Sequence, residues 1–257
     1  TIAHKYYLHV IQYYYFYLPL LAMLLVSSMY AFQYGHGQPL IVGPESYYHL
    51  TAFQERAWAE YFPLGMFVSL IPEKVLIIFP VLLTFSSVLL MLVLASRLKL
   101  ESETRFLFLL FLVLTPAFLF GASTISTSML AFFFILAGFV LLTNKNKTKY
   151  LALVPFALIS FVDLLSALIV FLLLMICRFT QRTDKKCTDK AMMLTIGLVL
   201  VNWLFLGKAF ISGPFHLQRI TADLMSDLGG ISGIGFTVLL LSMIGIVTAW
   251  RRQEYRW

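Results

Sequence analysis

The stretch YLALVPFALISFVDLLSALIVFLLLMICR, residues 150–178, decides how this chain folds. A membrane-crossing helix needs about 20 apolar residues, so the stretch is too long for one comfortable crossing and rather short for two. Asp163 interrupts it near the middle. A single crossing would separate the lysine-rich loop that follows from the other basic loops. Two crossings that turn near Asp163 would keep all basic loops on one side, and we predict this arrangement.

The composition of the whole chain identifies a membrane protein. Its 257 residues are 60% hydrophobic and only 12% charged, whereas soluble domains carry roughly 25% charged residues. No run alternates apolar and polar residues over about ten positions, as the strands of an outer-membrane barrel do. We therefore predict an all-α, multi-pass helical bundle in a cell membrane, with the lipid bilayer as its surroundings.

Apolar segments divide the chain into about eight crossing helices, which form one transmembrane domain over residues 1–257. The predicted spans are residues 12–33, 75–96, 106–121 and 128–143, two crossings within 150–178, and residues 191–209 and 232–250. Residues 34–74 form the predicted first external loop, and its later part is predicted to contain a juxtamembrane helix along the membrane surface. Residues 210–231 form the predicted last external loop.

The basic residues set the predicted orientation. With two crossings in residues 150–178, fifteen of the 19 Lys and Arg residues fall on one side, together with both termini. Cytoplasmic loops carry such an excess of Lys and Arg, so we place this side and both termini in the cytoplasm. These short loops also account for the net charge of +7, and we expect no nucleic-acid partner.

The other polar residues of interest fall on the predicted external side. Carboxylates, histidines and arginines beside a membrane boundary can form a metal or phosphate site. The alternative for each of them is an ordinary solvated loop residue. The guanidinium of Arg219 can form two parallel hydrogen bonds to phosphate oxygens. Alternatively, Arg219 can form a surface salt bridge with Asp223. The candidate residues are Glu45, Tyr48, His49, Ser126, Ser128, Asp163 and Arg219.

The segment GPESYYHL, residues 43–50, follows the first span. After it come a juxtamembrane helix with PLG, a span reading FPVLLTFSSVLLMLVLASRL, a span ending in LTPAFLF, a short polar turn and the span MLAFFFILAGFVLL. This order of elements resembles the GT-C superfamily of integral-membrane glycosyltransferases, and it looks most like the catalytic subunit of the archaeal oligosaccharyltransferase. The resemblance covers roughly residues 12–143, about half of the chain.

The resemblance implies transfer of a sugar from a polyprenyl-phosphate-linked donor at the extracytoplasmic face. In that family the acid of the first external loop helps to bind a divalent cation, Mg²⁺ or Mn²⁺, which offsets charge on the departing phosphate. By resemblance, Glu45 takes this catalytic and metal-binding position, with His49 as a further ligand. Tyr48 and His49 would shape the substrate site beside it.

The chain departs from the family's pattern at several positions. Ser126 and Ser128 stand where the family carries paired acids, and we expect them to contact substrate. Thr51 replaces the expected arginine, and the Trp-Trp-Asp-Tyr-Gly motif of acceptor recognition does not occur. Asp163 could supply a replacement catalytic carboxylate. The alternative function is therefore a catalytically inactive, GT-C-like accessory or scaffolding subunit, whose partners would be other membrane subunits.

Overall fold

The computed structural model of the chain is all-α in the part that it describes. The described residues are 2–36, 78–97, 101–124, 126–144, 146–179 and 184–205. The elements are α1 (Ile2–Gly35), α4 (Ile78–Arg97), α5 (Ser102–Leu114), α6 (Pro116–Ser123), α7 (Thr127–Leu142), the 3-10 helix η2 (Lys147–Ala152), α8 (Leu153–Val162), α9 (Leu164–Phe179) and α10 (Lys185–Phe205).

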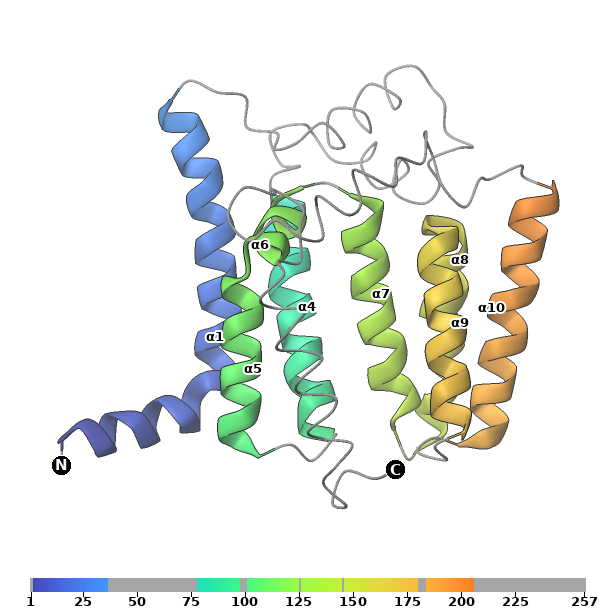
Figure 1. The fold of residues 1–257 in the computed structure, drawn as a ribbon, viewed down its shortest axis with the longest axis horizontal. Coiled ribbons are helices and arrows are strands. Elements are labelled where there is room, and N and C mark those ends of the chain that lie inside the picture. Colours follow the sequence, from blue (N-terminus) through green and yellow to red (C-terminus); the bar gives the residue numbers. More distant parts are fainter. Residues whose placement is uncertain are drawn as a thin grey trace, which may run out of the picture.

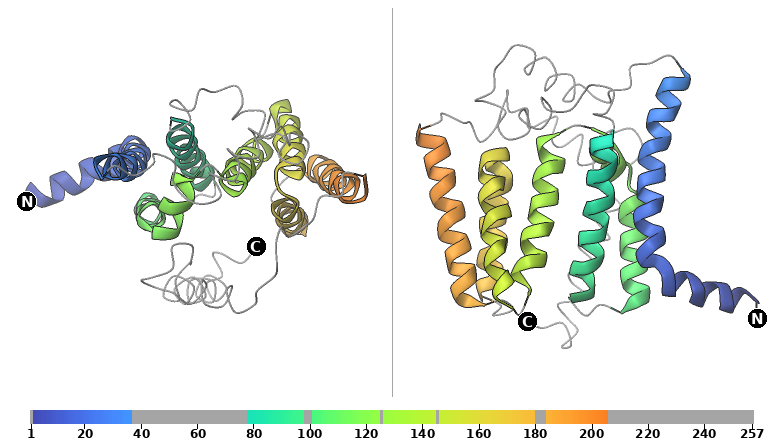
Figure 2. Two further views of the ribbon diagram at one scale, coloured as in Figure 1. Left: turned by 90° about the horizontal axis from the view of Figure 1, so that it is seen from above. Right: turned by 180° about the vertical axis from the view of Figure 1, so that it is seen from behind.

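The long helices stand side by side and run roughly parallel or antiparallel to one another (Figure 1). Seen from above, α1, α4, α7, α8 and α10 follow one another along a curved row, and α5 and α9 lie on the same side of that row (Figure 2). Each helix of the row packs against the next. α7 contacts both α4 and α8, so it joins the two halves of the bundle.

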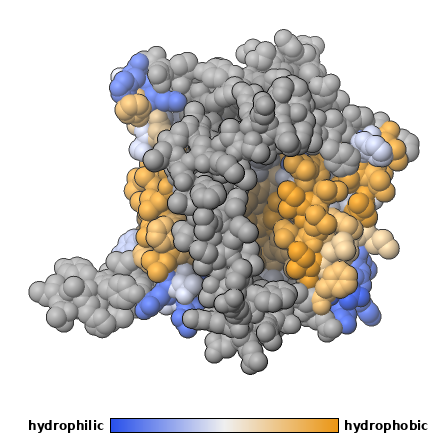
Figure 3. Space-filling view, in the orientation of Figure 1, coloured by the Kyte–Doolittle hydropathy of each residue, from blue (hydrophilic) through white to orange (hydrophobic). Residues whose placement is uncertain are grey.

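Three helices are long and apolar enough to cross a membrane, namely Tyr13–Gly35, Ile78–Arg97 and Lys185–Leu204. Helices α7 and α9 are also apolar but shorter. Large hydrophobic side chains are exposed along the middle of the bundle, whereas hydrophilic residues gather toward its ends (Figure 3). These features support a multi-pass membrane protein, as the composition predicts.

The predicted turn at Asp163 is confirmed. α8 ends at Val162 and α9 begins at Leu164, because Asp163 between them has extended backbone angles (φ −153°, ψ 116°). The chain runs along α8, returns along α9 beside it and reverses again into α10 (Figures 1 and 2). Residues 150–178 therefore fold back on themselves, as the distribution of basic residues requires.

The predicted span at residues 106–121 is broken into two helices. α5 ends at Leu114, Thr115 takes extended angles (φ −67°, ψ 127°), and α6 begins at Pro116. Proline disfavours helical angles at the residue before it, and it fits the first turn of a helix, where its missing N–H is not needed. The sequence TPAFLF therefore starts a second, short helix.

Positive charge is confined to one end of the described bundle. At this end, which we call the basic end, α4, α7 and α9 finish and α1, α5, η2 and α10 begin (Figure 1). The opposite end, which we call the polar end, has no Lys or Arg among the described residues. The described Lys and Arg are Lys5, Arg97, Arg105, Lys147, Lys149, Arg178, Lys185, Lys186 and Lys190.

Buried side chains hold the bundle together in clusters. On α1 they recur every four residues, a spacing that places them on one helix face, and this face packs against α4, α5 and α6. They are Tyr14, Leu18, Ala22, Val26 and Tyr30.

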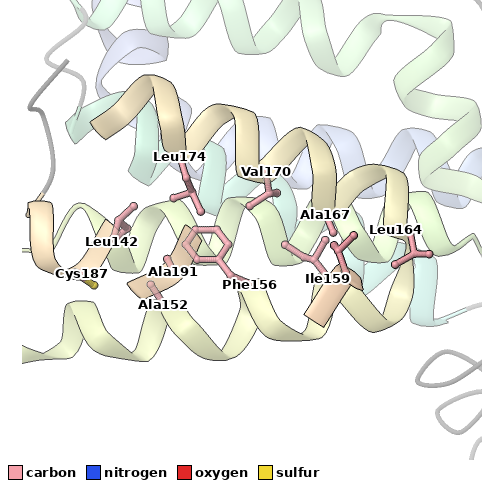
Figure 4. Packing of buried hydrophobic residues seen from close by; sticks show 11 residues of the cluster. Leu142, Ala152, Phe156, Ile159, Leu164, Ala167, Val170, Leu174, Cys187 and Ala191 are labelled. Atoms are coloured by element: carbon pink, nitrogen blue, oxygen red, sulfur yellow. The ribbon is translucent and has the colours of Figure 1, made fainter. Parts of the chain in front are cut away.

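The cluster around α8 joins α7, η2, α9 and α10 (Figure 4). Its members are Leu142, Ala152, Phe156, Ile159, Leu164, Ala167, Val170, Leu174, Cys187, Ala191 and Val199.

One ion pair ties η2 to the start of α10, with Lys149 Nζ donating to Asp184 Oδ2. This hydrogen bond lowers the pKa of Asp184 from its ordinary value of 3.8 and raises the pKa of Lys149 from 10.5. The Asp184 contribution to stability is therefore present above its unfolded pKa and is lost as the pH falls through its folded pKa. The Lys149 contribution is lost only as the pH rises through its own raised pKa.

Asp184→Asn should lower the Tm by a nearly constant amount between about pH 5 and pH 9, and the difference from wild type should shrink below about pH 4. Asparagine keeps an oxygen for the Cys187 N–H, which donates to Asp184 Oδ1 at 3.1 Å. The substitution thus removes the charge and retains the helix cap. Thermal unfolding in detergent micelles measures the effect, and a difference that stays constant into acid would show that the ion pair is not its source.

Candidate functional site

Three described helices end or begin at the polar end, next in sequence to segments that carry candidate residues. α1 finishes there at Gly35, α4 begins there at Ile78, and α10 finishes there at Phe205 (Figure 1). The chain therefore leaves and re-enters the described bundle at this end on either side of residues 37–77. It also leaves the bundle at this end before residues 206–257.

Four of the predicted site residues lie outside the described residues. Glu45, Tyr48 and His49 belong to residues 37–77, and Arg219 belongs to residues 206–257. Their predicted roles stay predictions. Ser126, Ser128 and Asp163 are described, and all three lie at the polar end, on the α6–α7 junction and the α8–α9 turn.

Ser126 begins α7 as its N-cap residue. Its side-chain oxygen accepts a hydrogen bond from the backbone N–H of Met129 at 3.1 Å. This bond satisfies one of the N–H groups that the start of a helix leaves without an internal partner. Ser126 is buried, whereas Ser128 in the first turn of α7 is exposed. The arrangement gives Ser126 a structural role, and the substrate contact predicted for Ser128 stays a prediction.

Asp163 caps the start of α9. Its Oδ1 accepts from the N–H of Leu165 at 3.2 Å, and its Oδ2 accepts from the N–H of Ser166 at 3.0 Å and from the Ser166 hydroxyl. The helix dipole also favours a carboxylate at this position. An ionised carboxylate has about four lone-pair sites, so Asp163 keeps capacity for a further donor or a cation while it caps the helix.

Asp163→Ala should lower the free energy of unfolding by about 1 kcal/mol, because α9 loses its N-cap. Asp163→Asn and Asp163→Ser keep an oxygen that can accept the same backbone N–H groups, so they should stay within about 0.5 kcal/mol of wild type. Denaturant unfolding in detergent micelles measures the three variants. Equal losses for alanine and serine would show that the cap does not hold the turn together.

Two hydroxyl groups from neighbouring helices bind the end of α6. Tyr30 Oη on α1 donates to Ser123 O at 2.5 Å. Thr84 Oγ1 on α4 donates to Pro80 O at 2.7 Å and also lies 3.3 Å from Ala122 O. The last carbonyls of a helix have no partner within it, and unpaired polar groups are costly inside a membrane. These contacts hold the end of α6 in place, and the junction between α6 and α7 that follows it carries Ser126 and Ser128.

A buried amide joins α10 to α8 close to the α8–α9 turn. Asn202 Nδ2 donates to Ser160 O at 2.9 Å, and both residues are fully buried. Asn202 Oδ1 and Ser160 Oγ have no hydrogen-bond partner among the described residues. Ser160 precedes Asp163 by one helical turn, so this bond holds α10 against the helix that ends at Asp163.

Sequence reasoning missed these interhelical contacts. Asn202 offered a signal, because an amide in an apolar span usually faces the interior of the bundle. Tyr30 offered none, because α1 is rich in tyrosine and Tyr34, one turn further on, is exposed. Which tyrosine is buried depends on where α1 ends relative to its neighbours.

The described part of the polar end offers one carboxylate, that of Asp163. No group of three or more His, Cys, Asp or Glu side chains that could hold a metal ion occurs among the described residues. Carboxylate oxygens suit Mg²⁺ and Mn²⁺, and the predicted ligands Glu45 and His49 lie outside the described residues. The chain matches no known protein family, no curated protein and no solved structure.

Proposed function

We propose that the chain is a membrane glycosyltransferase of the GT-C kind, which transfers a sugar from a polyprenyl-phosphate-linked donor at the polar end of the bundle. The observation that carries the proposal is the position of Asp163, at the end opposite every described Lys and Arg. An excess of Lys and Arg marks the cytoplasmic side, so the polar end would face away from the cytoplasm. The whole chain would then cross about eight times, with both termini inside.

The connection between α1 and Glu45 supports a site at this end. Glu45 follows Gly35, the last residue of α1, by ten positions. A crossing helix needs about 20 apolar residues, so ten positions are too few for a further crossing, and we place Glu45 on the same side of the membrane as Asp163. A carboxylate at this level could meet the phosphate headgroup of a lipid-linked sugar.

In the proposed reaction an acceptor O–H or N–H group attacks the anomeric carbon of the sugar and gives up its proton to water, and the bond from that carbon to the phosphate oxygen breaks. The oxygen keeps the electron pair, so polyprenyl phosphate leaves with an added negative charge. A bound Mg²⁺ or Mn²⁺ would offset this charge. Glu45 and His49 would hold the ion, Tyr48 would line the sugar site, and the Arg219 guanidinium would pair with phosphate oxygens.

The test is sugar transfer from polyprenyl-linked donors in membranes that contain the wild-type chain or Glu45→Gln. Glutamine keeps the size of the side chain and removes its charge, and we expect transfer to fall on the order of a hundredfold, as when a group that stabilises charge in the transition state is lost. Glu55→Gln, in the same external loop, is the matched control and should retain transfer. Equal activity of wild type and Glu45→Gln, or no transfer by wild type, would overturn the proposal.

Asp163→Asn separates the catalytic role of Asp163 from its role as a helix cap. If the carboxylate takes part in transfer, this variant loses activity at unchanged stability. If Asp163 only caps α9, transfer is retained. The second outcome removes Asp163 from the proposed site, and the proposal then depends on the Glu45→Gln result alone.

A catalytically inactive accessory or scaffolding subunit is the second candidate. It is favoured by Ser126, whose hydroxyl oxygen serves the N-cap of α7 at a position where the family carries acids. This function predicts stable co-purification with a membrane partner, unaffected by Glu45→Gln. Mn²⁺ binding to the wild type but not to Glu45→Gln, measured by electron paramagnetic resonance, would decide against it.

A further inference from the structure

Basic side chains and an exposed tyrosine gather where η2 meets the start of α10. We call this surface the η2–α10 patch, and it consists of Lys147, Lys149, Tyr150, Lys185, Lys186 and Lys190. The two elements are fixed to each other by the Lys149–Asp184 ion pair and by Cys187 Sγ, which donates to Lys149 O at 3.4 Å. Cys187 is fully buried in the cluster around α8. The patch is therefore a defined surface and not a set of independent loop charges.

Most of the positive charge on this surface has no carboxylate partner among the described residues. Two described carboxylates nearby are already engaged, because Asp184 pairs with Lys149 and Asp189 accepts from Arg178 Nε at 2.7 Å. Together with Arg178, the surface carries six cations against these two acids, a formal excess of four positive charges. The cations without a carboxylate partner among the described residues are Lys147, Lys185, Lys186 and Lys190.

Tyr150 lies close to two of the ammonium groups. Its ring centroid is 5.6 Å from Lys149 Nζ and 5.3 Å from Lys190 Nζ, within the range of cation–π attraction. The two lysines come from different elements, so the ring helps to hold their charges together at one place. An exposed tyrosine is also typical of the boundary between lipid tails and headgroups.

The position of the patch matches such a boundary. Lys185 is the first residue of a helix that is long and apolar enough to cross a membrane. Next to Tyr150 along the chain, Leu151 and Val154 expose more than half of their surface. Along the chain, cationic side chains are therefore followed within about one helical turn by apolar side chains that can face lipid tails.

We propose that the η2–α10 patch is a docking surface for the anionic phospholipid headgroups of the leaflet at the basic end. Its positive charge is complementary to these headgroups, and its apolar border suits the acyl chains beneath them. Each lysine close to an anionic bilayer contributes roughly a fivefold preference. The proposal requires that the chain lies in a membrane, and it does not depend on sugar transfer.

The test compares phosphatidylglycerol with phosphatidylcholine as added lipids for the full chain purified in detergent. Native mass spectrometry counts the lipids that remain bound, and we expect the wild type to retain phosphatidylglycerol preferentially. In the triple variant Lys185→Gln, Lys186→Gln, Lys190→Gln, the ratio of bound phosphatidylglycerol to bound phosphatidylcholine should fall on the order of tenfold or more. This value allows for screening by salt. The triple variant with arginine at the same positions keeps the charge and should retain the preference.

These lysines are exposed, so the glutamine variant should keep the wild-type Tm in phosphatidylcholine, and this Tm confirms its folding. An unchanged lipid preference in the folded glutamine variant would overturn the proposal. Equal retention of both lipids by the wild type would overturn it as well. If inorganic phosphate raised the Tm of the wild type as much as phosphatidylglycerol does, the patch would bind a free anion, and the proposed lipid surface would be refuted.

Discussion

Replacing Phe156 by alanine is expected to lower the free energy of unfolding by about 2–3 kcal/mol. The ring is fully buried in the cluster around α8, and it meets the Phe139 ring of α7 edge-on, with ring centroids 5.5 Å apart (Figure 4). Its removal leaves a cavity between the helices. In water-soluble cores this substitution costs about 3–5 kcal/mol. We expect less here, because lipid is as apolar as the core and only the packing contribution is lost.

Reversible unfolding in mixed micelles measures this loss. Val154→Ala, on the same helix, is the matched control, because Val154 is exposed and its truncation should change the free energy of unfolding by less than about 0.5 kcal/mol. If Phe156→Ala is no more destabilising than Val154→Ala, the Phe156 ring does not fill the contact between α7 and α8.

Gly138→Ala is expected to destabilise the fold by about 1–3 kcal/mol, through the opposite defect. A Cβ atom at this position would lie 2.7 Å from Cζ and 2.8 Å from Cδ1 of Phe156, and closer still to Cε1. Real Cβ contacts of this kind do not occur, so the ring or the helix must move. Because the ring is enclosed on all sides, it cannot move without disturbing the cluster.

Gly197→Ala provides the matched control for Gly138→Ala. Gly197 lies within α10, and a Cβ there would meet nothing within 4 Å. Since alanine favours helix over glycine, this variant should be neutral or more stable by up to about 1 kcal/mol. The two substitutions make the same chemical change, so their difference isolates the contact with Phe156. Combining Gly138→Ala with Phe156→Leu should recover part of the loss, because the smaller side chain makes room for the new methyl group.

The sequence predicts the course of the chain well, because length and charge constrain it. The turn at Asp163 follows from a segment too long for one crossing and from the need to keep the basic loops together. The predicted span over residues 191–209 begins six residues after the start of α10 at Lys185. The first two turns of α10 are polar, and an apolar-segment criterion does not detect helix that lies at the membrane boundary.

The contacts between helices could not be predicted in the same way. Lipid and protein neighbours are equally apolar, so a membrane helix gives a weak indication of which face is buried. α7 shows this, because its residues 129–142 are apolar on all sides and the buried position of Gly138 becomes evident only beside Phe156. Asp163 was predicted as a candidate catalytic carboxylate, but its hydrogen bonds to α9 depend on backbone geometry that composition does not specify.

The bond between Asn202 and Ser160 has a consequence for the order in which the chain is made. If α10 entered the bilayer alone, the Asn202 amide would face hydrocarbon without a partner, which is unfavourable. α8 leaves the ribosome before α10, so the carbonyl that accepts from Asn202 is already in the bilayer when α10 arrives. Biogenesis therefore favours docking of α10 onto a preformed α8–α9 pair, and a ribosome-bound chain that lacked α8 would hold α10 less firmly in the membrane.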